Sequence, residues 1–341
     1  MGSEIIKQKL ATFKAEIDKV IDSEKFLEII SGEDCRRQML SYLKEFQKFT
    51  QDGKRIRPFL VSFGYEMTTG SYDSRIVMPS LAFEIFQSAI LIHDDIIDAS
   101  DTRRGKPCMH KTIGEAKAIC VGDFGFMAAA DVCAGADFDP SLVIKAVRHL
   151  SHMIELTIAG EIKDVELSET DDFDEEDILN MYRLKTSWYT MTGPMQLGAI
   201  LGGAGEALLS DIEKIGTAMG TAFQIVDDII GIFGTKETIG KSNLSDMNEG
   251  KKTVLYSHFM THADENMKNE FSCVYGTGNG KEKELEKVRK LFTDAGSLDY
   301  SKALCKKYVD EAETIINKMS ISDKHKDTLH DFLDYLCVRN F

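Results

Sequence analysis

Apolar residues recur at helical spacing along most of this chain. In the stretch 5–30, residues 6, 10, 13, 17 and 21 are all apolar, and that spacing places them on one face of a helix. The same period predicts helices at 77–98, 116–134, 142–166, 175–192, 212–231, 282–292, 303–319 and 324–338. Alternation with period two, the sign of a half-buried strand, is almost absent. The pattern therefore predicts an all-α protein, built as a helical bundle.

Glycine and proline residues divide the predicted helices at a few places. We expect breaks at Gly53, Pro79, 105–107, 139–140, 193–194 and 276–280, because these residue types interrupt helical geometry. One longer stretch, 233–253, is irregular, with three glycines, two asparagines and four lysines. No internal repeat or linker separates one part of the chain from another. We therefore expect a single domain that spans residues 1–341.

Composition narrows the class of protein. The chain is 43% hydrophobic and 28% charged, the balance of a soluble globular protein. Its N-terminus lacks the apolar core of a signal peptide, and its uninterrupted apolar runs are too short to cross a bilayer. The net charge of −15 argues against non-specific binding of nucleic acid. The seven cysteines are odd in number and widely spaced, which predicts reduced thiols in a cytoplasmic protein.

Two predicted helices end in carboxylates. In the first, Asp94 and Asp98 are four residues apart with Asp95 between them, so both stack on one helical face, where like charges repel. A divalent ion would relieve that repulsion, and magnesium prefers oxygen ligands such as carboxylates. The motif taken alone also arises by chance in a chain this rich in aspartate. Its position at the end of an apolar helix favours a functional interpretation.

The second acidic helix repeats the arrangement. Gln224, Asp227, Asp228 and Gly231 stand at i, i+3, i+4 and i+7, so their polar groups share one face of an otherwise apolar helix. Two carboxylate helices facing each other would hold a cluster of divalent ions. Such a cluster is what allows a diphosphate to bind next to carboxylates.

Cationic residues surround both acidic helices in the sequence. Each alone is more often a solvated surface charge, but together they supply donors for two anionic groups. They are Lys54, Arg55 and Arg57, then Arg103, Arg104 and Lys106, then Lys185, Lys241, Lys251 and Lys252.

With these segments in their order and spacing, the chain resembles the trans-prenyltransferases, the head-to-tail isoprenyl diphosphate synthases. The resemblance runs from about residue 50 to residue 255. It rests on the sequence 53–58 (Gly-Lys-Arg-Ile-Arg-Pro), 93–98 with 103–105, 122–123, 185–186, 224–231, and 240–253 with its Gly-Lys pairs and Asp246. The combination is highly specific, whereas each part alone is weak.

The resemblance implies a fold and an assembly. It implies an all-α bundle of the isoprenoid synthase type around a deep central cavity, and a homodimer. The reaction it implies is the magnesium-dependent condensation of isopentenyl diphosphate with an allylic diphosphate. The irregular stretch 233–253 would then serve as a lid that keeps water from the carbocation.

The resemblance also implies roles for individual residues. Magnesium ions, three of them with substrate bound, are expected on Asp94, Asp95, Asp98 and Asp227, with Asp228 in support. The allylic diphosphate is expected to contact Arg103, Lys185, Lys241 and Lys251 directly, with Thr186 and Gln224 nearby. Isopentenyl diphosphate is expected on Lys54, Arg57, Arg104 and Gln87. The residues expected to carry catalysis are Asp94, Asp95, Asp98, Arg103, Lys185 and Asp227.

Two positions depart from the pattern of the family. The second motif ends in Gly231 rather than aspartate, so it has one carboxylate fewer. Glu161 stands where many relatives have glutamine, which adds a negative charge.

Three other functions fit the sequence less well. A class I terpene cyclase would leave the Gly-Lys-Arg-Ile-Arg-Pro and Arg-Arg segments without a purpose. A nucleotide-binding P-loop at 234–242 has one residue too many and follows an acidic helix instead of a strand. A non-catalytic subunit of a heteromeric prenyltransferase remains an alternative, although such subunits usually lose aspartates from the first motif and this chain keeps all three.

Product length is the property that the sequence decides least. Ala89, five residues before Asp94, is small enough for a fifteen-carbon chain to pass along the helix. Phe86 lies eight residues before Asp94, about 12 Å up the helix and on a similar face to Ala89 and Ile90. Phe86 as a floor predicts a twenty-carbon product, geranylgeranyl diphosphate. A farnesyl or longer-chain product remains possible, because Phe86 would pack equally well against a neighbouring helix.

Overall fold

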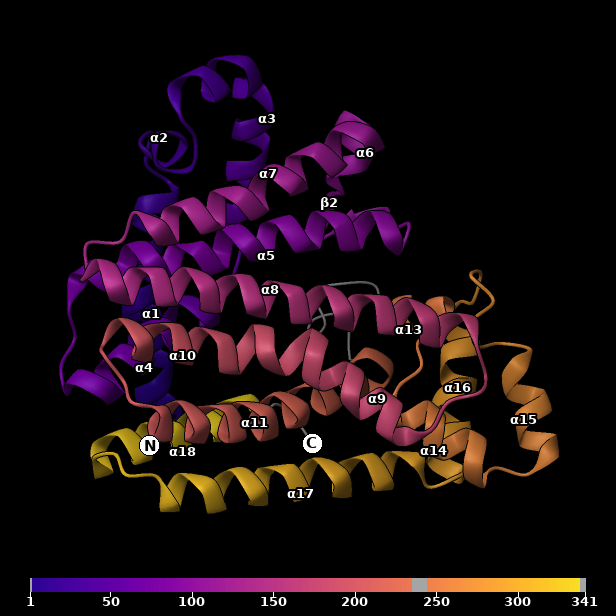
Figure 1. Ribbon diagram of the computed structural model, residues 1–341. Helices are drawn as coiled ribbons and strands as arrows, with labels where there is room; N and C mark the ends of the chain where they lie inside the picture. Colours follow the sequence, from indigo (N-terminus) through magenta and orange to yellow (C-terminus); the bar gives the residue numbers. More distant parts are fainter. Residues whose placement is uncertain (1, 235–243, 338–341) are drawn as a thin grey trace. The chain divides into compact units, whose positions relative to one another are not determined.

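A computed structural model describes residues 2–234 and 244–337 (Figure 1). Its first half consists of α1 Gly2–Ile21, α2 Phe26–Ile30, α3 Glu33–Gln51, α4 Ile56–Thr69, the 3₁₀ helix η1 Ser74–Ile76, α5 Val77–Ile97, α6 Met109–Ile113, α7 Glu115–Ala134 and α8 Pro140–Glu169. The second half consists of α9 Glu175–Tyr182, the π-helix η2 Arg183–Thr192, α10 Gly193–Leu201, α11 Glu206–Phe233, α13 Ser245–Glu249, α14 Val254–His262, α15 Glu265–Ser272, α16 Glu282–Asp294, α17 Ser297–Lys318 and α18 Asp323–Cys337.

The all-α fold class predicted from the sequence is confirmed. In the described ranges the strands are the two-residue pair β1 Thr102–Arg103 and β2 Lys106–Pro107, which run antiparallel. Pro79 does not break a helix as expected, because it is the third residue of α5, where no intrahelical N–H bond is needed. Likewise, α10 begins at Gly193 directly after η2, so the predicted break at 193–194 is absent. The helix predicted over 5–30 is interrupted between Ile21 and Phe26.

The chain divides into two compact units, each assembled from separated stretches. The first comprises residues 1–154, 190–213 and 319–332, and the second comprises 155–189, 214–318 and 333–341. Because the stretches alternate along the sequence, no single cut separates the two units. The expected single domain over 1–341 stays a prediction.

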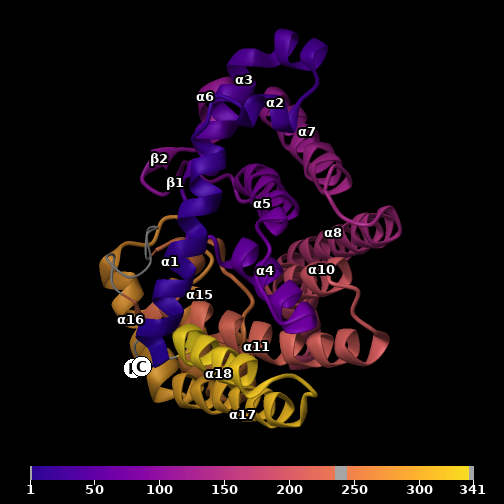
Figure 2. The same ribbon diagram turned by 90° about the vertical axis from the view of Figure 1, so that its left-hand side faces the viewer.

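The first unit is organised around α5, whose apolar side chains are buried. Phe83, Phe86 and Ala89 have no exposed surface. Helix α7 runs beside α5 in both views (Figures 1 and 2), and the two approach closely where a Cβ added at Gly125 would lie 2.8 Å from the Cβ of Ala89. The backbone can come this close only because residue 125 carries no side chain. This crossing fixes the helix that ends in the first acidic motif.

The second unit has an aromatic core. The rings of Phe259 and Phe271 lie 4.5 Å apart, those of Phe271 and Tyr275 also 4.5 Å, and Phe292 lies 5.2 Å from Phe271. These residues come from α14, α15, α16 and the turn after α15, which gather near the orange part of the ribbon (Figure 1). Such contacts bury large apolar areas and favour tilted or offset ring pairs. They hold together the segments that follow the second acidic helix.

Two helices are long and apolar enough to cross a membrane when judged by length and composition. They are Ser74–Ile97 and Glu206–Phe233, and in each case 67% of the apolar window is buried inside the protein. Both are core helices of the fold, since their apolar surface is already covered.

Candidate active site

The first acidic motif lies at the C-terminal end of α5, where Arg103 bridges two of its carboxylates. Arg103 donates from Nη2 to Asp94 over 2.9 Å and from Nε to Asp95 over 2.6 Å. Burial alone would lower the pKa of Arg103, but the Asp95 and Asp94 carboxylates raise it above its ordinary value. Asp98 caps the helix, with its backbone N–H bonded to the Asp94 carbonyl. The structure thus brings Asp94, Asp95 and Arg103 together.

A tight hairpin returns Arg103 to the helix end. Arg103 pairs with Lys106 across the two strands, and the two turn residues, Arg104 and Gly105, both have positive φ, at 54° and 74°. Positive φ at both central positions defines the type I′ turn, which matches the twist of a two-residue hairpin. Gly105 suits its left-handed position in this turn, whereas Arg104 adopts the same region without the freedom of glycine.

The carboxylates of this motif fit a magnesium ion. Asp95 is 1% exposed, and its Oδ2 atom has no hydrogen-bond partner. A buried, unsatisfied carboxylate oxygen is costly unless something binds it, and an all-oxygen donor set suits magnesium. In the described part of the chain, no three acidic, histidine or cysteine side chains are already arranged around one point. Arg103 occupies the position between Asp94 and Asp95 instead.

The residues predicted to bind isopentenyl diphosphate lie near the start of α4 and on the hairpin. Lys54 is exposed on the loop before α4, and Arg57 donates from Nη2 to Thr190 Oγ1 over 2.8 Å. Arg104 donates to the backbone carbonyl of Asp52, two residues before Lys54. Gln87 is half-buried on α5. Within the first unit, the structure therefore ties Arg104 to the Lys54 loop.

A pocket of about 380 Å³ lies beside the hairpin. Four cationic residues line it, Lys48, Arg103, Arg104 and Lys106, together with the carboxylates of Glu45 and Asp52. Lys48 and Lys106 are largely exposed and are paired with Glu45 and Asp52 at 2.7 Å each, so the two arginines supply the charge for any anion bound there.

The second acidic motif, in the second unit, is held by a chain of hydrogen bonds. Thr186 donates to Gln224 Oε1 over 2.6 Å, and Gln224 Nε2 donates to Asp228 Oδ1 over 2.8 Å. Tyr182 donates to the other oxygen of Asp228. Burial raises the pKa of Asp228 to about 8. Both oxygens of Asp228 are thus engaged by protein groups, one of them the side-chain amide of Gln224.

Lys185 lies between two carboxylates of the same unit. Its Nζ atom is 2.9 Å from Glu161 and 2.6 Å from Asp164. Helix α8 approaches η2 closely at this point, since a Cβ at Gly160 would lie 2.4 Å from the backbone nitrogen of Lys185. The π-helical turns of η2, a feature often found at functional sites, carry both Lys185 and Thr186. Glu161, a departure from the family pattern, is therefore a direct partner of a predicted diphosphate-binding lysine.

The glycine that ends the second motif is also explained by its surroundings. A Cβ at Gly231 would lie 1.9 Å from Oδ2 of Asp246. The Asp246 carboxylate therefore occupies the space beside Gly231. Lys251, another predicted ligand of the diphosphate, lies 3.5 Å from Asp246 and 3.3 Å from Glu249. Lys241 lies outside the described residues.

Sequence reasoning assigned no role to several polar residues that the structure brings into these networks. In the sequence, Tyr182 looks like any buried aromatic residue, and Asp164 is one of several acidic residues on α8. Neither residue stands out without the structure. Asp246 stood among the matched segments without a role. Arg55 was counted only as one of the basic residues.

The residues predicted to set product length are buried on α5. Phe86 lies against Phe126 of α7, with ring centroids 5.7 Å apart. Ala89 sits at the close crossing with Gly125, and Ile90 is half-buried. Phe86 and Ala89 therefore both face α7.

The fold matches solved structures of known class over nearly its whole length. The geranylgeranyl pyrophosphate synthetase of Pyrococcus horikoshii superposes with a TM-score of 0.82 at 26% identity, covering 98% of this chain and 99% of that one. A geranylgeranyl pyrophosphate synthase of Corynebacterium glutamicum, complexed with isoprenyl diphosphate and magnesium, superposes with a TM-score of 0.86. At 22% identity over 99% of both chains, that second match shows the fold alone. The fold is therefore the all-α fold of isoprenyl diphosphate synthases.

Sequence comparison identifies the family within that class. The family model for polyprenyl synthetase matches residues 39–292. The geranylgeranyl diphosphate synthase of Saccharolobus solfataricus is 32% identical over 295 residues, which cover 85% of this chain and 86% of that protein. This chain belongs to the polyprenyl synthetase family. The predicted family and the predicted enzyme class, a trans-prenyltransferase, are both confirmed.

Proposed function

We propose that this protein condenses isopentenyl diphosphate with allylic diphosphates, head to tail, and makes geranylgeranyl diphosphate in a magnesium-dependent reaction. The observation that carries the proposal is the end of α5. There, Asp94 and Asp95 share Arg103, and a buried oxygen of Asp95 lacks a partner. Anion-binding and cation-binding groups are thus placed side by side, as a metal-bound diphosphate requires.

In this proposal, the acidic and the basic residues of the site have different roles. Asp94, Asp95 and Asp98 would hold magnesium at the first motif, and Asp227 would do so at the second. Bound there, magnesium neutralises the charge that develops on the departing diphosphate. Arg103, Lys185 and Lys251 bind the phosphate oxygens directly. Three ions with substrate bound is the expected number.

Polar groups around the second motif orient the reacting carbon chain. Asp228, held by Tyr182 and Gln224, fixes the amide of Gln224 against Thr186. The carbonyl of Gln224 and the hydroxyl of Thr186 then stabilise the allylic carbocation electrostatically. The double bond of isopentenyl diphosphate attacks this cation, and the released diphosphate takes the proton.

Isopentenyl diphosphate binds through Lys54, Arg57 and Arg104, with Gln87 as a further polar partner. Three cationic side chains suit a diphosphate that carries about three negative charges and has no metal of its own. Arg104 is already tied to the loop that carries Lys54.

Two further properties belong to the proposal. The twenty-carbon product is supported by Phe86, buried on α5, and by the names of the relatives from S. solfataricus and P. horikoshii.

A homodimer is supported by large apolar side chains exposed on the first unit. Met127 and Ile119 of α7 are 69% and 40% exposed, and Ile144 of α8 is 61% exposed. Large apolar side chains that stay this exposed in the single chain are candidates for burial against a second copy. A cytoplasmic location fits the free cysteines.

Incorporation of radiolabelled isopentenyl diphosphate tests the proposal. The purified protein is incubated with dimethylallyl, geranyl or farnesyl diphosphate, with magnesium or with excess chelator. We expect label in an apolar product of twenty carbons, and none with the chelator. Absence of product with every primer would contradict the proposal and favour the alternative of a non-catalytic subunit. A product of another length would overturn the geranylgeranyl assignment alone.

A further inference from the structure

A buried arginine stands next to the predicted binding site for isopentenyl diphosphate. Arg55 lies between Lys54, which is exposed, and the start of α4, which carries Arg57. Arg55 itself is 2% exposed, so its guanidinium cannot bind substrate from this position. A charge buried this completely must be compensated by partners.

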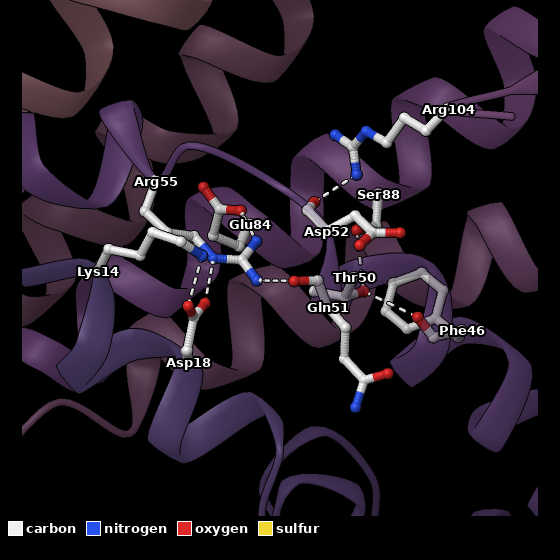
Figure 3. A network of polar contacts seen from close by, with 10 residues as sticks. All are labelled: Lys14, Asp18, Phe46, Thr50, Gln51, Asp52, Arg55, Glu84, Ser88 and Arg104. Atoms are coloured by element: carbon white, nitrogen blue, oxygen red, sulfur yellow. Dashed lines mark hydrogen bonds and ion pairs between the residues drawn. The ribbon is translucent and has the colours of Figure 1, made fainter. Parts of the chain in front are cut away.

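Three helices supply those partners, as Figure 3 shows. Arg55 donates from Nε to Asp18 of α1 over 2.8 Å and from Nη1 to Glu84 of α5. It donates from Nη2 to the backbone carbonyl of Gln51, at the end of α3, over 2.7 Å. Only a guanidinium has three nitrogens in a planar fork that reaches three acceptors at once. The side chain therefore fixes the loop 52–55 relative to α1, α3 and α5.

The backbone of the loop depends on this side chain. Arg55 is the N-cap of α4 and has φ at 58°, in the left-handed region that ordinary residues avoid. Such a conformation persists only where the surroundings enforce it. Gly53 leaves room for the bridge, since a Cβ there would lie 2.9 Å from Nη1 of Arg55. The left-handed turn places Arg55 inside and leaves Lys54 outside.

The other edge of the loop is held by the hairpin. Arg104 donates to the carbonyl of Asp52, and Lys106 donates to its carboxylate over 2.7 Å. Arg104 is itself a predicted ligand of isopentenyl diphosphate. Two arginines, one buried and one on the hairpin, thus fix both ends of the segment that presents Lys54.

We propose that Arg55 is a positioning residue for isopentenyl diphosphate, which sets Lys54 and Arg57 in place for the diphosphate through the bridge to Asp18, Glu84 and Gln51. The proposal rests on the proposed function of this site. Because Arg55 touches no substrate, its loss acts through the loop and raises the KM for isopentenyl diphosphate. The allylic substrate, which has other predicted ligands, keeps its KM.

Two substitutions and a matched control test this role. Arg55→Met removes the bridge, and Arg55→Lys keeps a cation for Glu84 but loses the fork. Thr50→Val serves as the control, because Thr50 is 1% exposed and bonds to Ser88 Oγ over 2.9 Å and to the Phe46 carbonyl, close to the loop (Figure 3). For each variant, KM for both substrates, kcat and Tm are measured, together with equilibrium binding of isopentenyl diphosphate alone.

For Arg55→Lys we expect a Tm nearer to wild type than that of Arg55→Met, and a KM for isopentenyl diphosphate raised by about 10- to 100-fold, the cost typical of lost support for a binding group. Thr50→Val should lower Tm and leave both KM values unchanged. If Arg55→Met does not fold, Arg55→Lys decides the question alone. A wild-type KM in Arg55→Lys would overturn the proposal. A wild-type protein that neither binds nor consumes isopentenyl diphosphate would instead overturn the proposed function.

Discussion

At the scale of single residues, the charged groups of the candidate site are paired with one another. Arg103 lies against Asp94 and Asp95, and Lys185 lies against Glu161 and Asp164. Such pairs hold long side chains in one place, which reduces the conformational entropy lost when substrate binds. In the proposed function, a diphosphate with its magnesium would replace each partner by a group of the same charge. The proposed site would therefore be organised before its substrates bind.

The carboxylates of the first motif should act on the chemical step. We expect Asp94→Ala and Asp98→Ala to lower kcat by about 100-fold or more, because they remove charge stabilisation that grows in the transition state. Steady-state kinetics with magnesium at saturation measures the effect. Asp101→Ala is the matched control, since Asp101 is exposed and pairs with Lys111 at 2.9 Å. Equal kcat for Asp94→Ala and Asp101→Ala would contradict the assignment.

Glu161 should weaken the binding of the allylic substrate. Its carboxylate lies 2.9 Å from Lys185 Nζ and brings a negative charge close to a predicted diphosphate ligand. Replacement by glutamine keeps the shape and removes the charge. We therefore expect Glu161→Gln to lower the KM for the allylic diphosphate and to leave that for isopentenyl diphosphate unchanged. Glu169→Gln, exposed at the end of the same helix, should change neither value. A raised allylic KM in Glu161→Gln would show that the carboxylate is needed to hold Lys185.

Residue spacing selects candidate side chains, but it does not show what they contact. Asp94 and Asp98 stand out because four residues make one helical turn, and that rule needs no tertiary structure. The contact of Arg103 with Asp94 depends on a type I′ turn, and that of Gly231 with Asp246 depends on how a later segment folds back. Neither is encoded in local spacing. Arg55 was missed for the same reason, since its three partners come from α1, α3 and α5.

At the scale of helices, glycine residues allow pairs of helices to approach each other closely. In the first unit, α4 and α10 cross where a Cβ at Gly64 would lie 2.0 Å from the Met195 carbonyl oxygen, and one at Gly198 would lie 1.8 Å from that of Val61. The obstacles are backbone atoms, which cannot turn aside as a side chain does. Apolar periodicity predicted most helices, whereas these crossings depend on the partner helix.

The crossing of α4 and α10 should not tolerate alanine. We expect Gly198→Ala to reduce the free energy of unfolding by about 1–3 kcal/mol, the usual cost of overpacking a core. Gly205→Ala is the control, because nothing lies within 4 Å of a Cβ at that position. Urea unfolding followed by circular dichroism measures both variants. If Gly198→Ala were as stable as Gly205→Ala, the close approach of the two helices would be wrong.

At the scale of the whole molecule, the fold class and the reaction class were within reach of the sequence, and the product length was not. A helical pattern without strands defines an all-α protein, and six or more motifs in order define the family. Product length depends on the depth of a cavity whose walls come from several helices. From the sequence, depth can be assigned only to side chains on α5, because their distance from Asp94 follows from their residue number. The contact of Phe126 of α7 with Phe86 is visible only in the structure.

The length of the product therefore tests whether Phe86 of α5 limits the growth of the chain. We expect Phe86→Ala to yield products longer than twenty carbons, because it removes a buried ring about 12 Å up the helix from Asp94. Phe126→Ala, which removes its neighbour at 5.7 Å, should act in the same direction. Ala89→Phe should shorten the product, but Ala89 lies against Gly125, so its Tm must be measured alongside. Phe59→Ala is the control, because Phe59 is 6% exposed and stacks on Phe63 within α4. Reversed-phase chromatography of the dephosphorylated products gives the chain lengths. An unchanged distribution in Phe86→Ala would mean that the ring only packs α5 against α7, and that another helix forms the floor.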